Sequence, residues 1–111
     1  MMKKSQKDRL KRAGWSVGSV KEFLGLSDEE AALIEMKLAL AQSLKARRLE
    51  HGLTQDELAS QLGSSQSRVA KMEAADAAVS IDLLVRSLLA MGASRQDVGR
   101  IIGRRSAIPA A

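Results

Sequence analysis

The most restrictive feature of this sequence is the repeated spacing of residues that start and stop helices. Five segments begin at a Ser or Thr and end at a Gly, at 19–25, 27–52, 54–63, 80–92 and 94–103. A Ser or Thr side chain accepts a hydrogen bond from a free N–H at a helix start, and Gly readily adopts the left-handed conformation that closes a helix. The spacing predicts a succession of helices joined by short turns.

The strongest helix signal lies at residues 27–52. Ser27 and Glu30 have the spacing of a capping box, in which each side chain bonds the backbone N–H of the other residue. Acidic residues fill the first turn and basic residues the last turns, as the helix dipole favours. We expect this helix to organise the core through an apolar stripe made of Ile34, Leu38, Ala41 and Leu44.

The following helices are shorter. Thr54 and Glu57 form a second capping box, and that helix is expected to end at Gly63 after about two turns. Ser65 is placed to cap the next helix, "QSRVAKMEAA", for which the sequence offers no closing glycine. Ser80 starts "IDLLVRSLLAM", and Ser94 starts a last helix that Gly103 should stop.

Composition agrees with a helical fold. Apolar residues make up 45% of the 111 residues but aromatic residues only 2%, and Ala, Leu, Lys, Arg and Glu favour helices over sheets. We predict an all-α protein with a compact five-helix domain at 27–103. A basic N-terminal arm and short leader helix occupy 1–26, and residues 104–111 form a flexible tail.

Several classes of protein are excluded by what the sequence lacks. It has no cysteine and one histidine, His51, so thiolate catalysis, Cys or His metal clusters and a Ser-His-Asp triad cannot be assembled. No glycine-rich phosphate loop is present either. We therefore predict no enzyme activity, no cofactor and no metal. The apolar runs are too short for a membrane span and no signal-peptide pattern is present, so we expect a cytoplasmic protein.

Charge is distributed unevenly along the chain. The net charge is +5, with +5 on residues 1–25 (seven basic, two acidic), −3 on 26–63 (four and seven) and +3 on 64–111 (seven and four). This balance suits a nucleic-acid partner, because Lys and Arg displace counterions from phosphates. We expect the basic residues of the arm to be solvated rather than to contact the DNA backbone. These residues are Lys3, Lys4, Lys7, Arg9, Lys11 and Arg12.

Residues 54–73 have the residue types that two steeply crossing helices need. Ala59 supplies a small side chain where the backbones approach, and Gly63 tolerates the left-handed turn. The apolar residues that would pack the pair onto the long helix are Leu58, Leu62, Val69 and Met72. At about 100° per residue, the face opposite Val69 carries Ser67, Ala70, Lys71 and Ala74, with Gln66 at the exposed helix start. This face is small and polar, and its Gln, Lys and Ser can hydrogen-bond base edges.

These residues resemble the helix-turn-helix proteins of the XRE type, which are related to phage Cro and repressor proteins. The resemblance covers about Leu44 to Leu89, and "LTQDELASQLGSSQSRVAKME" is its specific part. It implies a lambda-repressor-like fold and a homodimer that places its recognition helix, 66–74, in the major groove of double-stranded operator DNA. The DNA-binding residues that follow from it are Gln55, Ser65, Gln66, Ser67, Arg68 and Lys71, with Gln55 as a phosphate contact.

The resemblance also implies an ion pair. Arg48 and Glu73 match positions that brace the recognition helix against the long helix, so we read them as structural. The sequence departs from the family pattern in two places. Ser64 stands where an apolar residue is usual, and "EAADAAVS" lacks the glycine that often follows the glutamate.

Within this family, the segment "GWSVGSVKEFLGLSDEEAALIEMKLALAQSLK" resembles the leader of HigA-type antitoxins. That resemblance implies a repressor of its own operon that neutralises a RelE/HigB-like ribonuclease toxin. The residues expected to contact the toxin are Trp15, Val17, Val20, Phe23 and Leu24, and their alternative role is to cap the protein's own core. Two other functions stay open: a stand-alone XRE-type repressor without a toxin, and a helical protein-interaction module that does not bind DNA.

Overall fold

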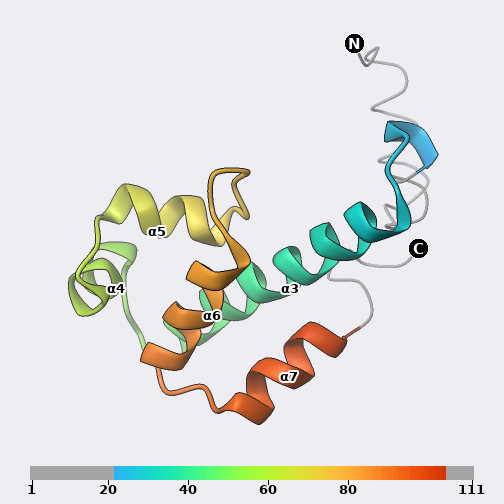
Figure 1. Cartoon of the computed structure of the whole chain (residues 1–111). Coiled ribbons are helices and arrows are strands. Elements are labelled where there is room, and N and C mark those ends of the chain that lie inside the picture. Colours follow the sequence, from blue (N-terminus) through green and yellow to red (C-terminus); the bar gives the residue numbers. More distant parts are fainter. Residues whose placement is uncertain (1–21, 105–111) are drawn as a thin grey trace.

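The structure is a computed structural model that describes residues 22–104 (Figure 1). Over these residues it contains no strand, and a short helical turn at 22–24 precedes the main helices. The main helices are α3 (Asp28–Glu50), α4 (Gln55–Leu62), α5 (Gln66–Glu73), α6 (Ile81–Ala90) and α7 (Arg95–Gly103). The predicted all-α class with five helices in its compact part is confirmed.

Within the described residues the helix starts lie where the sequence predicts them, whereas the start predicted at Ser19 lies outside those residues. Ser27, Thr54 and Ser94 each complete a reciprocal capping box with the residue three positions on. Ser65 and Ser80 accept a hydrogen bond from the N–H of the third helical residue, at 3.2 and 3.1 Å. Local hydrogen bonding therefore fixes all five starts, because each cap satisfies an N–H that has no partner inside its helix.

The helix ends follow the predicted glycines with one exception. Gly52 and Gly63 take the left-handed conformation, with φ of 67° and 64°, just beyond α3 and α4. Gly103 was expected to stop the last helix in the same way, but it is the last residue of α7. The backbone leaves the helix at Arg104, which is extended with φ −67° and ψ 141°.

The core lies around the C-terminal half of α3. This helix packs against α5, α6 and α7, while α4 packs against α5 (Figure 1). Leu40 and Leu44 of α3 are fully buried, and the other large side chains below 2% exposure are Leu58, Val69, Met72, Leu84 and Leu88. Three of the four residues that the apolar spacing indicated are thus in the core, Leu58, Val69 and Met72. The fourth, Leu62, is half-buried and packs against it.

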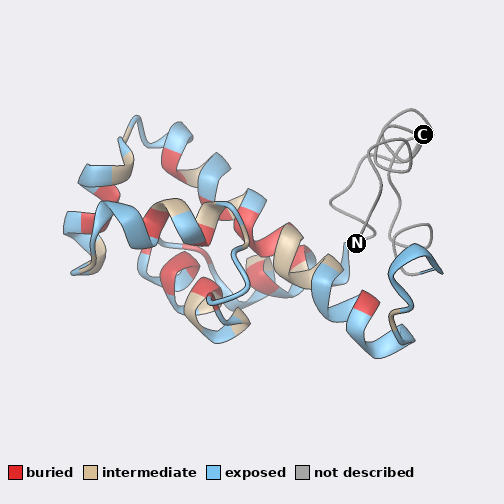
Figure 2. Cartoon of the chain, turned by 90° about the horizontal axis from the view of Figure 1, so that it is seen from above, coloured by how far each residue is buried: buried red, intermediate tan, exposed pale blue. Residues whose placement is uncertain are grey.

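The predicted apolar stripe of α3 is only partly a core stripe. Ala41 and Leu44 are buried and Leu38 is half-buried, but Ile34 is 38% exposed. At 1.5 Å per residue, the 23 residues of α3 extend about 34 Å, whereas α5, α6 and α7, which pack on it, have 8 to 10 residues and extend about 12 to 15 Å. The first turns of α3 therefore project beyond the other helices, and Figure 2 shows them mostly exposed.

The loop after α5 closes without the usual glycine. Ala75 takes the left-handed conformation with φ 53°, the only positive φ among the described residues other than glycines. The N–H of Asp76 donates to the carbonyl of Lys71 at 3.0 Å, and the N–H of Ala75 to that of Met72 at 3.2 Å. These bonds form the usual closing pattern of a helix C-terminus. The missing glycine therefore leaves the turn intact and places an alanine in it.

Candidate nucleic-acid interface

Two buried side chains set the orientation of α5. Val69 and Met72 are 0% and 1% exposed, and they hold one face of the helix against the core. Ala59 is 3% exposed where α4 and α5 approach, and the N–H of Ser64 donates to its carbonyl at 2.8 Å across the turn. The face opposite Val69 points to solvent as the rotation argument expected: Gln66, Ser67, Lys71 and Ala74 are exposed and Ala70 is half-buried.

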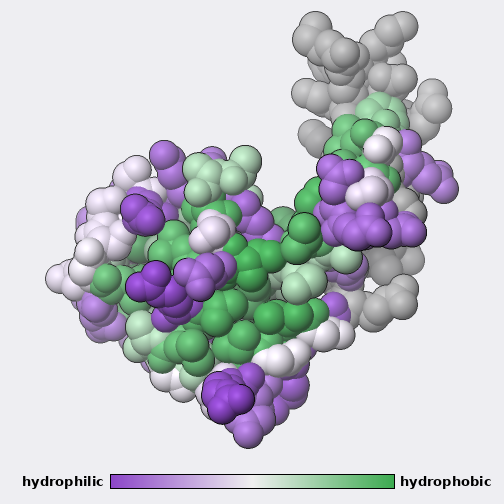
Figure 3. Space-filling model, in the orientation of Figure 1, coloured by the Kyte–Doolittle hydropathy of each residue, from purple (hydrophilic) through white to green (hydrophobic). Residues whose placement is uncertain are grey.

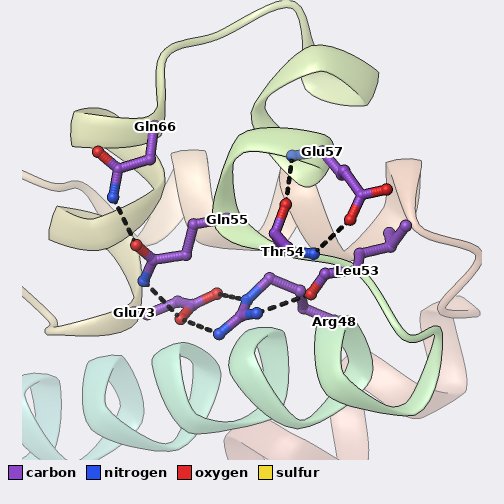
Figure 4. Close-up of polar contacts among 7 residues, drawn as sticks. All are labelled: Arg48, Leu53, Thr54, Gln55, Glu57, Gln66 and Glu73. Atoms are coloured by element: carbon purple, nitrogen blue, oxygen red, sulfur yellow. Dashed lines mark hydrogen bonds and ion pairs between the residues drawn. The ribbon is translucent and has the colours of Figure 1, made fainter.

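Arg48 and Glu73 form an ion pair between α3 and the end of α5 (Figure 4). Arg48 Nε donates to Glu73 Oε2 at 2.6 Å and its Nη2 to Oε1 at 3.1 Å, while Nη1 donates to the carbonyl of Leu53 at 2.7 Å. The two side chains are 10% and 4% exposed. Hydrogen bonding to Glu73 raises the pKa of the Arg48 guanidinium above its ordinary value. This pairing is the one that the resemblance implied.

Gln55 extends this network to the recognition helix. Its Nε2 donates to Glu73 Oε1 at 3.1 Å, and its Oε1 accepts a hydrogen bond from Gln66 Nε2 at 2.7 Å (Figure 4). An amide group has two N–H donors and an oxygen with two lone pairs, so Gln66 keeps one N–H and its oxygen for a further partner. The structure thus joins the two glutamines, which the sequence reading had treated as separate contacts.

The remaining DNA-binding residues expected from the sequence lie together at the start and outer side of α5. Ser65, Ser67, Arg68 and Lys71 are exposed and line one shallow depression of about 290 Å³ with residues of the next loop and α6. Ser65 also has a structural role, because its Oγ accepts the N–H of Arg68. All six expected residues therefore occupy one continuous region made of α4, α5 and the turn between them.

The structure adds a cation that sequence reasoning missed. Arg86 of α6 lines a second depression, of about 430 Å³, which shares Arg68 with the first and also includes Ser64. Its Nη1 lies 3.6 Å from Asp82 Oδ2 in an exposed ion pair. No motif marks Arg86, because it lies 15 residues beyond Lys71 and reaches the site only through the packing of α6. Ser64, the first departure from the family pattern, has a buried Oγ without a hydrogen-bond partner.

The residues expected to contact a toxin lie mostly outside the described part. Trp15, Val17 and Val20 fall outside residues 22–104. Phe23 and Leu24 are 37% and 54% exposed, and they lie at the far end of α3 from α4 and α5 (Figure 1). The described part of the chain contains no cluster of three or more His, Cys, Asp or Glu that could hold a metal ion. It also contains no helix long and apolar enough to cross a membrane.

Comparison with known families gives a match over the same region. Residues 44–98 match the model of the helix-turn-helix family. The matched segment runs from the C-terminal part of α3 to the first half of α7, and so contains the complete α4–α5 unit. Neither the comparison with curated proteins nor that with solved structures gave a match.

Proposed function

We propose that the chain is a sequence-specific repressor of the XRE type that binds its operator as a homodimer. The match of residues 44–98 to the helix-turn-helix family supports this proposal. The helix α5 of each subunit reads the major groove of one half-site. Domains of this family are DNA-binding and regulatory.

The observation that carries this proposal is the exposed face of α5. Gln66, Ser67 and Lys71 point away from the core, and the small Ala70 and Ala74 between them let a duplex approach closely. Lys71 suits guanine, Gln66 suits adenine, and the serine suits either base. Gln66 is held in place at the start of α5, because it bonds Gln55, which in turn bonds Glu73, the partner of Arg48.

The flanking residues suit the phosphate backbone. Ser65 and Arg68 lie at the N-terminal end of α5, where backbone N–H groups and the helix dipole favour an anion. Gln55 lies at the start of α4 in the same way and is half-exposed. Its Nε2 keeps a second N–H, beyond the one bonded to Glu73, that can donate to a phosphate oxygen. We assign these three residues to positioning and the exposed face of α5 to base readout.

We further propose that the repressor is an antitoxin that controls its own operon and neutralises a RelE/HigB-like toxin. Support comes from the resemblance of its leader and from the exposed Phe23 and Leu24, which lie far from α5 (Figure 1). A toxin bound there leaves the DNA-reading face open. The test is co-expression with the neighbouring reading frame. If that frame alone arrests growth and this chain relieves the arrest, the antitoxin role is supported. If either effect is absent, a stand-alone repressor is favoured.

DNA binding is tested with a labelled duplex from the region upstream of the gene, by fluorescence anisotropy at several salt concentrations. The regulator binds this duplex more tightly than a random one, and both affinities fall steeply with salt. Gln66→Ala and Lys71→Ala reduce the preference for the specific duplex by about tenfold to a hundredfold each. Arg95→Ala is the control, since Arg95 is exposed on α7, away from α5 (Figure 1). Equal affinity for both duplexes, or none, would favour the protein-interaction module.

A further inference from the structure

The exposed apolar side chains of the described part are concentrated at one end of the molecule. Among six large hydrophobic residues with high exposure, four lie between residues 23 and 34. Leu33 and Ile34 are 52% and 38% exposed, and with Leu26, Val79 and Ile81 they line a groove of about 380 Å³. Figure 3 shows apolar side chains continuing from the body of the molecule towards the start of α3. Contiguous apolar surface of this kind marks a binding site.

The segment that contains the start of α3 is acidic although the chain as a whole is basic. Residues 22–36 carry five acidic residues and no Lys or Arg: Glu22, Asp28, Glu29, Glu30 and Glu35. Glu30 itself lines the groove, together with Lys37 at its other end. An occupant with apolar anchors and several positive charges would complement this surface.

Such an occupant precedes the groove in the same chain. Residues 1–21 carry seven basic residues and one acidic residue, and they hold the single tryptophan, Trp15, with Val17 and Val20. Trp15 precedes the groove residue Leu26 by eleven positions, and an extended chain of that length reaches about 35 Å. A segment tethered so close has an effective concentration in the millimolar range, so weak contacts suffice.

We propose that residues 1–21 dock in this groove with Trp15 as the apolar anchor, and that the acidic segment 22–36 attracts their basic residues. The indole then covers Leu33 and Ile34, which the other helices leave exposed. Docking also has a consequence for the DNA-reading face. Val79 forms one wall of the groove and also lines the depression beside Ser67 and Lys71, so the docked segment contacts the loop that follows α5.

The single tryptophan makes the proposal testable in the intact chain. Trp15 fluorescence of the wild-type protein is expected at shorter wavelength, and with weaker quenching by acrylamide, than in the urea-unfolded chain. Leu33→Asn and Ile34→Asn each shift the emission towards that of the unfolded chain and increase quenching. High salt shifts the wild-type emission in the same direction, because it screens the attraction between the basic residues of 1–21 and the acidic segment 22–36.

Leu49→Asn is the matched control. Leu49 lies near the other end of the same helix and is 58% exposed, against 52% for Leu33, so the substitution has a similar effect on the helix without touching the groove. It leaves Trp15 emission unchanged, and circular dichroism verifies that all variants are folded. The proposal is overturned if the wild-type emission equals that of the unfolded chain, if the groove variants do not shift it, or if it shifts on dilution, which would mean that the segment docks on a second copy.

Discussion

Ala75 holds a left-handed backbone conformation that is unfavourable for any residue with a Cβ. The hydrogen bonds of the turn after α5 impose it, with φ of 53°. The left-handed conformation costs a non-glycine residue about 1 kcal/mol or slightly more. Ala75→Gly should therefore raise the free energy of unfolding by about 1 kcal/mol, measured by urea denaturation. The adjacent Ala74 has φ −87°, so Ala74→Gly should give no gain. Equal effects of both substitutions would contradict this account.

The Arg48–Glu73 pair is nearly removed from solvent, and this determines the effect of breaking it. Glu73→Ala leaves the guanidinium without its carboxylate and removes the acceptor of Gln55. Loss of one partner of a buried pair costs about 3 to 5 kcal/mol, so the variant should show a strongly reduced melting temperature. The double variant Arg48→Met/Glu73→Leu should recover part of the loss, because no buried charge remains. A Glu73→Ala protein with full thermal stability would show that the pair does not brace α5.

At the scale of single elements, the helix starts depend on ionised carboxylates. In each of the three capping boxes, a backbone N–H bonded to the carboxylate lowers its pKa, as for Glu57 with Thr54, Glu30 with Ser27 and Asp97 with Ser94. A carboxylate whose pKa is lower in the folded than in the unfolded state stabilises the fold at pH values above its pKa in the unfolded state. This contribution disappears as the pH falls through the folded pKa.

The stability of the wild-type protein should therefore be lost progressively below about pH 4.5, the ordinary value for a Glu carboxyl. A Glu30→Gln/Glu57→Gln variant should be less stable than wild type at pH 7, and the difference should shrink as the pH falls through the folded values. Urea midpoints from pH 7 to pH 3 measure this. Glu29→Gln is the control, because Glu29 lies beside a capping box without belonging to it. A difference that stays constant with pH would contradict the prediction.

The elements also show what a sequence can predict and what it cannot. The five helix starts and the turn at Gly63 depend on neighbours within a few residues, so the spacing of Ser, Thr, Glu and Gly was sufficient. The exposure of Ile34 depends on the lengths of helices that pack elsewhere on α3. The bonds of Gln55 to Gln66 and Glu73 depend on how α3, α4 and α5 meet. The periodicity of apolar residues predicts neither the exposure of Ile34 nor the hydrogen bonds of Gln55.

At the scale of the whole molecule, the apolar residues of α6 bear on assembly. The sequence has more of them than one helix face needs, and we read the excess as part core and part dimer contact. The structure assigns most of them to the core: Leu84, Leu88 and Met91, which directly follows α6, are buried, while Leu83 and Val85 are half-buried. Leu89 remains, 42% exposed. The proposed homodimer would place one α5 in each of two half-sites about one helical turn apart. We propose Leu89, an exposed leucine on the element after the motif, as a contact of that dimer.

Leu89→Arg should therefore weaken self-association and operator binding together while leaving the fold intact. A charge placed in an apolar interface must be desolvated without a partner, whereas at an exposed position of the monomer it stays hydrated. Sedimentation equilibrium should show a shift towards monomer, and anisotropy should show a larger loss for the two-half-site duplex than for a single half-site. Leu49→Arg introduces the same charge at a leucine that is 58% exposed on α3, and it should change neither measurement. If Leu89→Arg binds the full operator like wild type, the dimer forms through another surface, and the first turns of α3 become the next surface to test.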